Sequence, residues 1–330
     1  MPEKLKVSII GSGNWQVRMW VFEEQIDGRN LTDIINEKHE NVKYLPNVKL
    51  PDNVVAIPDV TEAAKDADIL VFVLPHQFVY KVCGSLKGVI SSKCRAISLI
   101  KGLDFRDNEL ALFSEEIERI LDIPCAALSG ANIASEVAEE RFSEATIACR
   151  NIDEEGPLYV DLFNTSYFDV KVIGDWRGLQ VCGALKNVIA VGSGIVDGLK
   201  LGNNAKSAVI RRGLVEMRRF GKAFFGGVHT ETFFESCGVA DLITTCAGGR
   251  NRRVAEAFVT TGKPIDVLEK DMLNGQKLQG SLTAQEVHSF LLARNKTEEF
   301  PLMTAVYRIL YENQHPKAIV EYLRSDQSFD

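Results

Sequence analysis

The sequence lacks any metal-binding or disulfide pattern. Its seven cysteines are odd in number and never form a C-x-x-C pair, and its five histidines lie far apart without an H-x-x-x-H spacing. Neither a metal site nor a disulfide framework is therefore predicted. Most of the cysteines lie inside apolar runs, so we expect buried free thiols in a reducing compartment. A nucleophile elbow of the G-x-S-x-G type is also missing, which leaves covalent hydrolysis without support.

The sequence also has no excess of positive charge. The formal net charge is −7 with a pI near 5.5, so we expect neither nucleic acid nor an anionic membrane as the main partner. We find no N-terminal apolar leader, no basic transit segment and no apolar stretch of 18 residues, and we expect a cytoplasmic protein. With 330 residues, 45% of them hydrophobic, the chain is long enough for two domains with sizeable cores.

A helix is missing from the best nucleotide-binding motif. The apolar run Val7–Ile10 leads into Gly11-Ser12-Gly13, as a buried strand leads into a dinucleotide phosphate turn. The third glycine is replaced by Gln16, and a second strand, Val17–Phe22, starts at once. Only nine residues separate Gly13 from the acidic Glu23, whereas the ribose-binding acid usually lies about 20 residues beyond the glycine turn. The chain from Gly11 to Val17 is also too short for a parallel crossover with its helix, which requires at least about 10–12 residues.

Beyond that motif the pattern predicts an α/β fold: a doubly wound Rossmann-type sheet, lacking its first crossover helix, followed by an all-α domain. We expect a polar surface excursion over Gln25–Asn53 with one short helix at Leu31–Glu37, and a domain boundary near Asp175, giving domains 1–175 and 176–330. The expected strands are Val54–Ile57, Ile69–Leu74, Ala96–Ile100, Cys125–Leu128, Ala145–Cys149 and Phe168–Ile173. The expected helices are Val60–Ala67, Gln77–Leu86, Glu109–Leu121, Ile133–Glu140, Gly156–Phe163, Gly178–Val196, Lys206–Phe225, Thr230–Cys246, Arg253–Thr261, Asp266–Leu273, Thr283–Arg294, Pro301–Tyr311 and Pro316–Leu323.

Several polar residues follow the predicted strands, at the sheet edge where open α/β sheets bind ligands. Lys101 comes directly after one such strand and His76 two residues after another, and each is either a functional group or an ordinary turn or surface residue. The small-residue turn from Ser129 to Ala134 suits backbone contact with a nucleotide, and equally suits a simple helix start.

In the helical half, Lys186 and Asp241 stand alone among apolar neighbours. A lysine with so little polar company is rarely buried unless paired, and burial would lower its pKa toward the range of proton transfer. The alternative is a structural ion pair. The turn Gly248–Arg253 leads into a helix, so its N–H groups and arginines could bind a phosphate dianion. The alternative is that it is a solvated basic turn. A nucleotide fold joined to a phosphate-binding helical domain favours hydride transfer.

These segments together resemble one family, the eukaryotic cytosolic NAD-dependent glycerol-3-phosphate dehydrogenases. The resemblance extends from about Val7 to Leu323 and rests on eight ordered motifs. They are Gly11-Ser12-Gly13-Asn14-Trp15, Pro75-His76-Gln77-Phe78, Ser98-Leu99-Ile100-Lys101-Gly102, Gly130-Ala131-Asn132-Ile133-Ala134, Gly183-Ala184-Leu185-Lys186-Asn187, Gly238-Val239-Ala240-Asp241-Leu242, Gly249-Arg250-Asn251-Arg252 and Asn274-Gly275-Gln276-Lys277-Leu278-Gln279-Gly280.

The resemblance implies a homodimeric enzyme that interconverts dihydroxyacetone phosphate, a small phosphorylated triose, and sn-glycerol 3-phosphate with NAD as cofactor. It implies that Lys186 is the general acid, with Asp241, Thr245 and Lys101 beside it. The substrate would be bound by Arg250, Asn251, Asn187, Lys101 and Gln279. The cofactor would be bound by Gly11, Ser12, Gly13, Asn14, Trp15, Phe22, Phe78, Ala134, Arg250, Lys277 and Gln279.

This chain departs from the family pattern after Trp15, where family members continue through a helix of roughly 20 residues. Two hypotheses follow. In the first, the shortened turn still admits NAD and the chain is a working dehydrogenase. In the second, it is a splice form, a gene-model variant or a pseudoenzyme that has lost NAD binding and keeps only the phosphate-binding helical domain.

Overall fold

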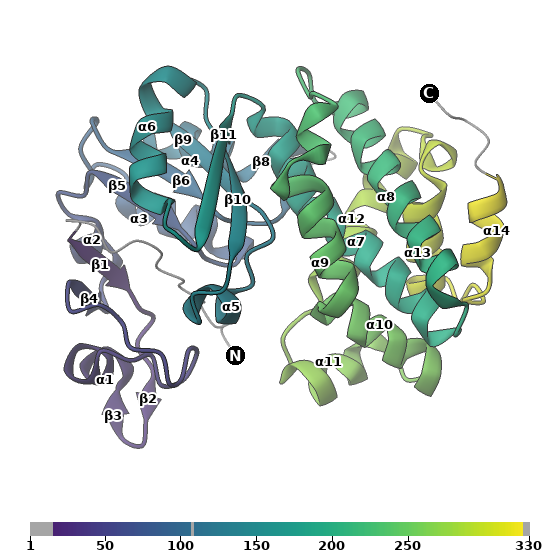
Figure 1. Cartoon of the computed structure of the whole chain (residues 1–330), viewed down its shortest axis with the longest axis horizontal. Helices are drawn as coiled ribbons and strands as arrows, with labels where there is room; N and C mark the ends of the chain where they lie inside the picture. Colours follow the sequence, from purple (N-terminus) through teal and green to yellow (C-terminus); the bar gives the residue numbers. More distant parts are fainter. Residues whose placement is uncertain (1–15, 107–108, 326–330) are drawn as a thin grey trace. The chain divides into compact units, whose positions relative to one another are not determined.

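The computed structural model describes residues 16–106 and 109–325 (Figure 1). The chain divides into two compact units, which we describe separately. Unit 1 comprises residues up to Ile100 together with Phe113–Leu128 and Asn132–Trp176, and unit 2 comprises Lys101–Leu112, Ser129–Ala131 and the chain from Arg177 onward. The predicted strand Val7–Ile10 and the glycine turn Gly11–Trp15 lie outside the described residues.

The elements of unit 1 alternate between strands and helices, as the sequence predicts. They are β1 (Val17–Trp20), β2 (Gln25–Ile26), β3 (Arg29–Asn30), α1 (Leu31–Lys38), β4 (Val54–Ile57), α2 (Val60–Ala64), β5 (Ile69–Phe72), the 3-10 turn η1 (His76–Phe78), α3 (Val79–Leu86), β6 (Arg95–Ser98), α4 (Phe113–Leu121), β9 (Cys125–Ser129), α5 (Ala134–Ala138), β10 (Ser143–Ala148), α6 (Ile152–Phe163) and β11 (Phe168–Ile173). The last residue of β9, Ser129, belongs to unit 2.

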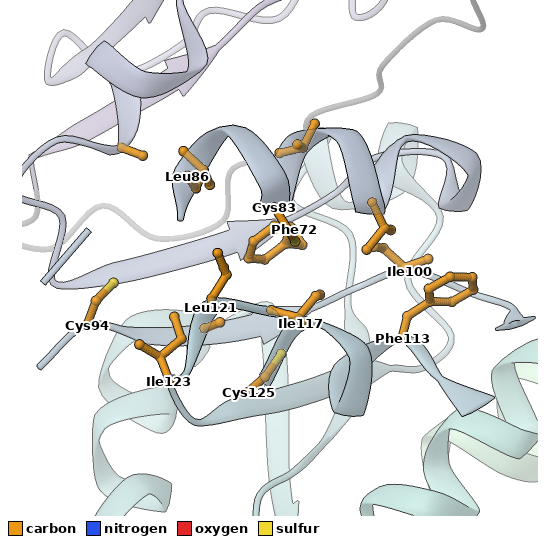
Figure 2. Close-up of a cluster of buried hydrophobic side chains, with 14 residues drawn as sticks. Phe72, Cys83, Leu86, Cys94, Ile100, Phe113, Ile117, Leu121, Ile123 and Cys125 are labelled. Carbon is orange, nitrogen blue, oxygen red and sulfur yellow. The ribbon is translucent and has the colours of Figure 1, made fainter. Parts of the chain in front are cut away.

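A five-stranded sheet in the order β11-β10-β9-β6-β5 forms the centre of unit 1. Because successive side chains of a strand point to opposite faces, neighbouring residues of β6 enter different cores. Ala96 packs into a core that includes residues of α3 and α4, while Ile97 packs with Tyr159 of α6 in the core on the other face. Figure 2 shows the first of these cores, in which Phe72, Cys83, Ile117 and other apolar side chains meet. Helices on both faces confirm the doubly wound fold class.

Strands β1 and β4 form a separate parallel two-stranded sheet, with Val17 opposite Val54. The excursion that follows β1 is not merely polar surface, as the sequence suggested, because Leu31 and Ile35 of α1 are buried against this small sheet. The acids after β1 are also engaged locally. Glu23 accepts hydrogen bonds from the Thr32 hydroxyl (2.6 Å) and amide (3.3 Å), and Glu24 pairs with Lys43 and Tyr44.

The elements of unit 2 are almost entirely helical. They are the hairpin β7 (Leu103–Arg106) and β8 (Glu109–Leu112), α7 (Trp176–Gly198), α8 (Gly202–Phe224), the 3-10 turn η2 (Glu231–Phe234), the π turn η3 (Ser236–Ala240), α9 (Asp241–Gly248), α10 (Arg250–Thr261), α11 (Ile265–Leu273), α12 (Gln279–Ala293), the 3-10 turn η4 (Thr297–Glu299), α13 (Pro301–Tyr311) and α14 (Ala318–Ser325). The first residue of α7, Trp176, belongs to unit 1.

The central helix of unit 2 is α7, in which every residue from Gly178 to Val196 is buried. It is long and apolar enough to cross a membrane by length and composition, contrary to our expectation that no such stretch exists, but its apolar window is wholly buried inside the protein. A helix that is hydrophobic all round is typical of a core position. Small residues allow this packing: a Cβ added at Gly194 would lie 2.2 Å from the Arg252 carbonyl oxygen.

Two predicted helices are wrong in part. The predicted helix Glu109–Leu121 starts only at Phe113, because residues before it pair with β7 in a hairpin whose Leu103 and Leu112 are buried. The predicted helix Thr230–Cys246 is broken into η2, η3 and α9. The break centres on Gly238, where a Cβ would lie 2.3 Å from the Phe233 carbonyl oxygen, and irregular turns of this kind often occur at functional sites. All seven cysteines are buried and free, as predicted.

A buried carboxylate of α8 caps α13. Glu216, 1% exposed, accepts hydrogen bonds from the amides of Leu302 (2.7 Å) and Met303 (3.0 Å), which are among the first N–H groups of that helix and have no partner within it. We expect Glu216→Leu to lower the free energy of unfolding by about 1.5–3 kcal/mol, because two buried donors lose a charged acceptor. Urea denaturation checks this, with Glu298→Gln, at an 87% exposed side chain, as the control. Equal stability of Glu216→Leu and the control would refute the capping role.

Candidate active site

The candidate site is built on Lys186, which lies in the middle of α7 and is 4% exposed. Its ammonium group donates to the Asp241 carboxylate, and it donates a second hydrogen bond of 2.8 Å to the Thr245 hydroxyl. Asp241 and Thr245 lie one turn apart at the start of α9, so both face the same side of that helix. The structure thus brings together three residues that sequence reasoning placed in the site.

Asp241 uses both carboxylate oxygens. Oδ1 accepts from Lys186 and from the Thr245 hydroxyl (3.4 Å), while Oδ2 accepts from Lys101 (3.2 Å) and the Ser129 hydroxyl (3.5 Å). Lys101 lies three residues after the end of β6, and Ser129 is the last residue of β9; both belong to unit 2. The sequence left the Ser129 turn open between nucleotide contact and a simple helix start, and it did not predict this contact with Asp241, because residues 112 positions apart carry no shared local pattern.

The pKa values of this pair reflect burial and crowded charge. Burial and, after it, the nearby Lys101 charge together lower the pKa of Lys186 to about 7, against the opposing effect of Asp241. Burial by itself would raise the pKa of Asp241, but the charges of Lys101 and Lys186 outweigh it and hold that pKa below its usual value. Asp241 is therefore ionised at neutral pH, whereas Lys186 can both hold and release a proton.

A glycine on α7 gives room to the groups beside Asp241. Gly183 lies one turn before Lys186 on α7, and a Cβ there would approach the Ser129 hydroxyl to 3.2 Å and Lys101 Cγ to 3.7 Å. The absence of a side chain at Gly183 thus leaves room for both donors beside Asp241. Ser129 itself is 3% exposed, so its hydroxyl is also removed from bulk solvent.

A second polar cluster surrounds the start of α10. Buried Asn251 donates to the side-chain oxygen of Asn187 (2.9 Å) and accepts from the Gly280 amide (2.8 Å). Exposed Arg250 donates to Gln276 Oε1 (2.9 Å), a residue that sequence reasoning did not single out. Since α10 begins at Arg250, free helix N–H groups and a guanidinium are available to an anion. Asn187 adjoins Lys186 in sequence, so one stretch of α7 contributes to both clusters.

The remaining predicted residues are spread over both units. In unit 1, Phe22 follows β1 and is 49% exposed, Phe78 is half-buried at the end of η1, and Ala134 is half-buried at the start of α5. In unit 2, Lys277 pairs with Glu269 at 2.8 Å, and half-buried Gln279 donates to Thr283 at 3.4 Å. Within the described residues, no group of three or more His, Cys, Asp or Glu side chains could hold a metal ion.

Comparison with known proteins matches both halves of the chain to one family. Residues 6–155 match the model of the NAD-dependent glycerol-3-phosphate dehydrogenase N-terminus, and residues 175–321 match the model of its C-terminus. The cytoplasmic NAD(+) glycerol-3-phosphate dehydrogenase of Mus musculus is 55% identical, over 98% of this chain and 97% of the relative. The Homo sapiens relative of the same description is 54% identical, over 94% of each chain.

Solved structures agree. The glycerol-3-phosphate dehydrogenase of Saccharomyces cerevisiae is 46% identical with a TM-score of 0.88, covering 98% of this chain and 100% of that one. The Plasmodium falciparum glycerol-3-phosphate dehydrogenase is 40% identical with a TM-score of 0.90, covering 99% and 97%. The fold is thus that of a two-part dehydrogenase, with a Rossmann-type first part and a helical second part. The chain belongs to the family of NAD-dependent glycerol-3-phosphate dehydrogenases.

The alignments also show that this chain is short within its family. The mouse alignment extends over 344 residues but includes 98% of this chain, or about 323 residues, so about 20 aligned positions have no residue here. The human alignment extends over 330 residues and includes 94% of this chain, or about 310 residues, which gives the same shortfall. The shortfall matches in size the helix that the sequence pattern lacks after Trp15.

Proposed function

We propose that the chain catalyses the interconversion of dihydroxyacetone phosphate and sn-glycerol 3-phosphate by hydride transfer with NAD(H), and that Lys186 supplies the proton. The observation that supports this most strongly is a buried lysine with a pKa near 7, held by Asp241 and Thr245. General acid catalysis is most effective when the pKa lies near the working pH. The substrate class is that of the family, a small phosphorylated triose.

Each residue of the first cluster has a definable role. Lys186 would donate its proton to the carbonyl oxygen of the ketone, and Asp241 would hold the ammonium group in place. Thr245 would fix the direction of the Lys186 proton through its 2.8 Å contact, and Lys101 would bind the substrate oxygens beside it. Burial makes these charges act at low effective dielectric, which strengthens their effect on the charge that develops at oxygen.

The second cluster would bind the substrate phosphate. Arg250 would donate from its guanidinium group and Asn251 from its side chain, with Asn187 and Gln279 completing the set. A planar guanidinium matches a phosphate with two parallel hydrogen bonds, and the start of α10 favours a negative charge.

The residues proposed for NAD fit a dinucleotide in chemical type. Exposed Phe22 and half-buried Phe78 offer flat apolar rings, and Ala134 leaves room for backbone contact. In unit 2, Arg250, Lys277 and Gln279 offer cations and an amide. The glycine-rich sequence motif adds Gly11, Ser12, Gly13, Asn14 and Trp15, which would bind the cofactor phosphates. When bound, the cofactor supplies the hydride.

We further propose that residues 1–175 serve as the NAD domain and residues 176–330 as the substrate and dimerisation domain of a homodimer. We place this homodimer in the cytoplasm, since similar proteins are named cytoplasmic.

Reduction should slow as pH rises. Lys186 must be protonated to act as an acid, so kcat/KM for dihydroxyacetone phosphate should fall about tenfold per pH unit above pH 7, where Lys186 loses its proton. The reverse oxidation requires neutral Lys186 and should rise through the same pH. Steady-state rates between pH 6 and pH 9 in both directions measure this. Profiles that are flat, or that move in the same direction, would contradict the assignment.

Turnover of a matched pair of ketones tests the proposal. Oxidation of NADH is followed with dihydroxyacetone phosphate and, in parallel, with dihydroxyacetone, which has the same reacting carbonyl but no phosphate. We expect rapid turnover of the phosphorylated ketone and at least about a hundredfold lower kcat/KM for the other, because the phosphate contacts are charged hydrogen bonds. Equal rates would reject the phosphate site, and no turnover of either would reject the proposed reaction.

A further inference from the structure

A buried carboxylate outside both clusters binds the segment Asn274–Gly280, which connects α11 to α12 and includes the first two residues of α12. Glu269 lies on α11 and is 4% exposed. Its Oε1 accepts the Leu278 amide at 2.8 Å and its Oε2 accepts the Lys277 ammonium at 2.8 Å. Its own carbonyl oxygen accepts the Gly275 amide at 3.0 Å. One residue of α11 therefore accepts hydrogen bonds from three residues of this segment.

The segment needs such an anchor because of its backbone. Asn274 and Gly275 both have positive φ (54° and 79°), so the chain leaves α11 through two left-handed residues. A left-handed asparagine is less favourable than a right-handed one, and contacts elsewhere must offset that cost. The two hydrogen bonds that the Glu269 side-chain oxygens accept supply those contacts.

The segment also reaches the proposed phosphate site at two points. Gln276 accepts from Arg250 at 2.9 Å, and the Gly280 amide donates to buried Asn251 at 2.8 Å. Gly280 approaches closely, since a Cβ there would lie 2.5 Å from the Asn187 carbonyl oxygen. The placement of Arg250 and Asn251 thus depends on where the segment lies.

The two hydrogen bonds that the Glu269 side chain accepts contribute unequally to holding the segment. The Lys277 side chain is 58% exposed, so its ion pair with Glu269 is screened by solvent and contributes little. The Leu278 amide belongs to a residue that is 1% exposed, and it has no route to water if its acceptor is removed. A buried donor without a partner carries the full desolvation penalty. The backbone bond to Leu278 is therefore the important one.

We propose that Glu269 is a positioning residue of the phosphate site: it holds the Asn274–Gly280 segment through the Leu278 amide and so fixes Gln276 against Arg250 and Gly280 against Asn251. This rests on the proposed function, because it takes that cluster as the site of the substrate phosphate. Lys277 is the exposed partner of this anchor, so its ammonium can leave Glu269 without releasing the segment.

Four proteins test the proposal: the unsubstituted chain, Glu269→Met, Glu269→Gln and Asp266→Asn. Glu269→Met removes both acceptors, whereas Glu269→Gln keeps an oxygen for the Leu278 amide and loses the charge. Asp266 is an exposed acid one turn earlier on α11, so Asp266→Asn is the control for loss of a negative charge. If Glu269→Met fails to fold, the milder substitution Glu269→Asp takes its place. Glu269→Asp keeps the charge but moves the carboxylate away from the Leu278 amide, because its side chain is one methylene shorter.

The measurements are KM and kcat for dihydroxyacetone phosphate and hydrogen exchange over residues 274–280. For Glu269→Met we expect KM to rise about tenfold or more and exchange of the segment to accelerate by a similar factor, with kcat within about threefold, on the scale of one charged hydrogen bond. Glu269→Gln and Asp266→Asn should stay within about threefold of the unsubstituted chain. With Glu269→Asp we expect intermediate changes in KM and exchange.

Three results overturn the proposal. The first is a Glu269→Met protein, or Glu269→Asp in its place, whose KM and exchange equal those of Asp266→Asn. The second is a change confined to kcat, and the third is a Glu269→Gln protein as impaired as Glu269→Met. If the unsubstituted chain does not turn over, the proposed function fails separately. Calorimetric binding of inorganic phosphate then replaces KM: tenfold weaker binding by Glu269→Met supports the anchor, and equal binding rejects it.

Discussion

Replacing Lys186 with methionine should lower kcat for reduction of dihydroxyacetone phosphate by about 10²–10⁴-fold and change KM little. Methionine keeps the apolar contacts of α7 but cannot donate a proton to the carbonyl oxygen. Asp241, which is 3% exposed, accepts hydrogen bonds from two lysines. The substitution removes the hydrogen bond from Lys186 and leaves the one from Lys101. Steady-state kinetics with NADH at pH 7 measure the effect.

The matched control is Lys206→Met. Lys206 is also largely buried, at 18% side-chain exposure, and also pairs with an aspartate, Asp197 at 2.7 Å, but it takes no part in the proposed site. Its substitution should leave kcat within about threefold, because a lost ion pair away from the reacting atoms affects stability instead. A Lys186→Met protein that keeps a tenth or more of the kcat of the Lys206→Met protein would disprove the general-acid role.

Replacing Arg250 with methionine should lower kcat/KM for dihydroxyacetone phosphate by about 10²–10³-fold, mainly through KM, because charged hydrogen bonds contribute about 1.5–3 kcal/mol each. Arg250 is the first residue of α10, and its guanidinium is already oriented by Gln276 at 2.9 Å. That orientation lowers the entropy lost when the phosphate binds.

Arg253→Met is the comparison for this prediction. Arg253 lies in the same first turn of α10 and is exposed, but it is not among the residues proposed to bind the phosphate. Kinetics with dihydroxyacetone add a second comparison, since its rate should not respond to either substitution. If Arg250→Met and Arg253→Met lose equal amounts of kcat/KM, the arginines act only through net charge and the specific phosphate site is rejected.

Much of the fold follows from local pattern. The helical and strand periods predicted the alternation of unit 1 and the helices of unit 2, and β4 and α13 have the predicted bounds. Where a predicted helix failed, contacts between distant residues explain the failure. The hairpin at Glu109 is stabilised by Phe105, whose ring lies edge-on against Phe290 of α12 at 5.9 Å. The hydrophobic periodicity of residues 109–121 does not predict this contact, because Phe105 and Phe290 lie outside that stretch.

The site was predictable in its residue types but not in its geometry. An isolated lysine and an isolated aspartate in apolar sequence indicated Lys186 and Asp241, because buried charges need partners. Ser129, Gln276 and Glu269 gave no such signal, since a serine, a glutamine or a helix-surface glutamate is usually solvated. Their roles arise only from the contacts that the fold creates.

The central claim is that this chain, although about 20 positions shorter than its relatives, is a dehydrogenase that uses NADH. Titration of the full chain with NADH, followed by addition of dihydroxyacetone phosphate to the same sample, tests it most directly. We predict saturable NADH binding and then oxidation of the bound NADH when the ketone phosphate is added. Binding of dihydroxyacetone phosphate without any binding of NADH would contradict the claim and would leave a phosphate-binding protein without dehydrogenase activity.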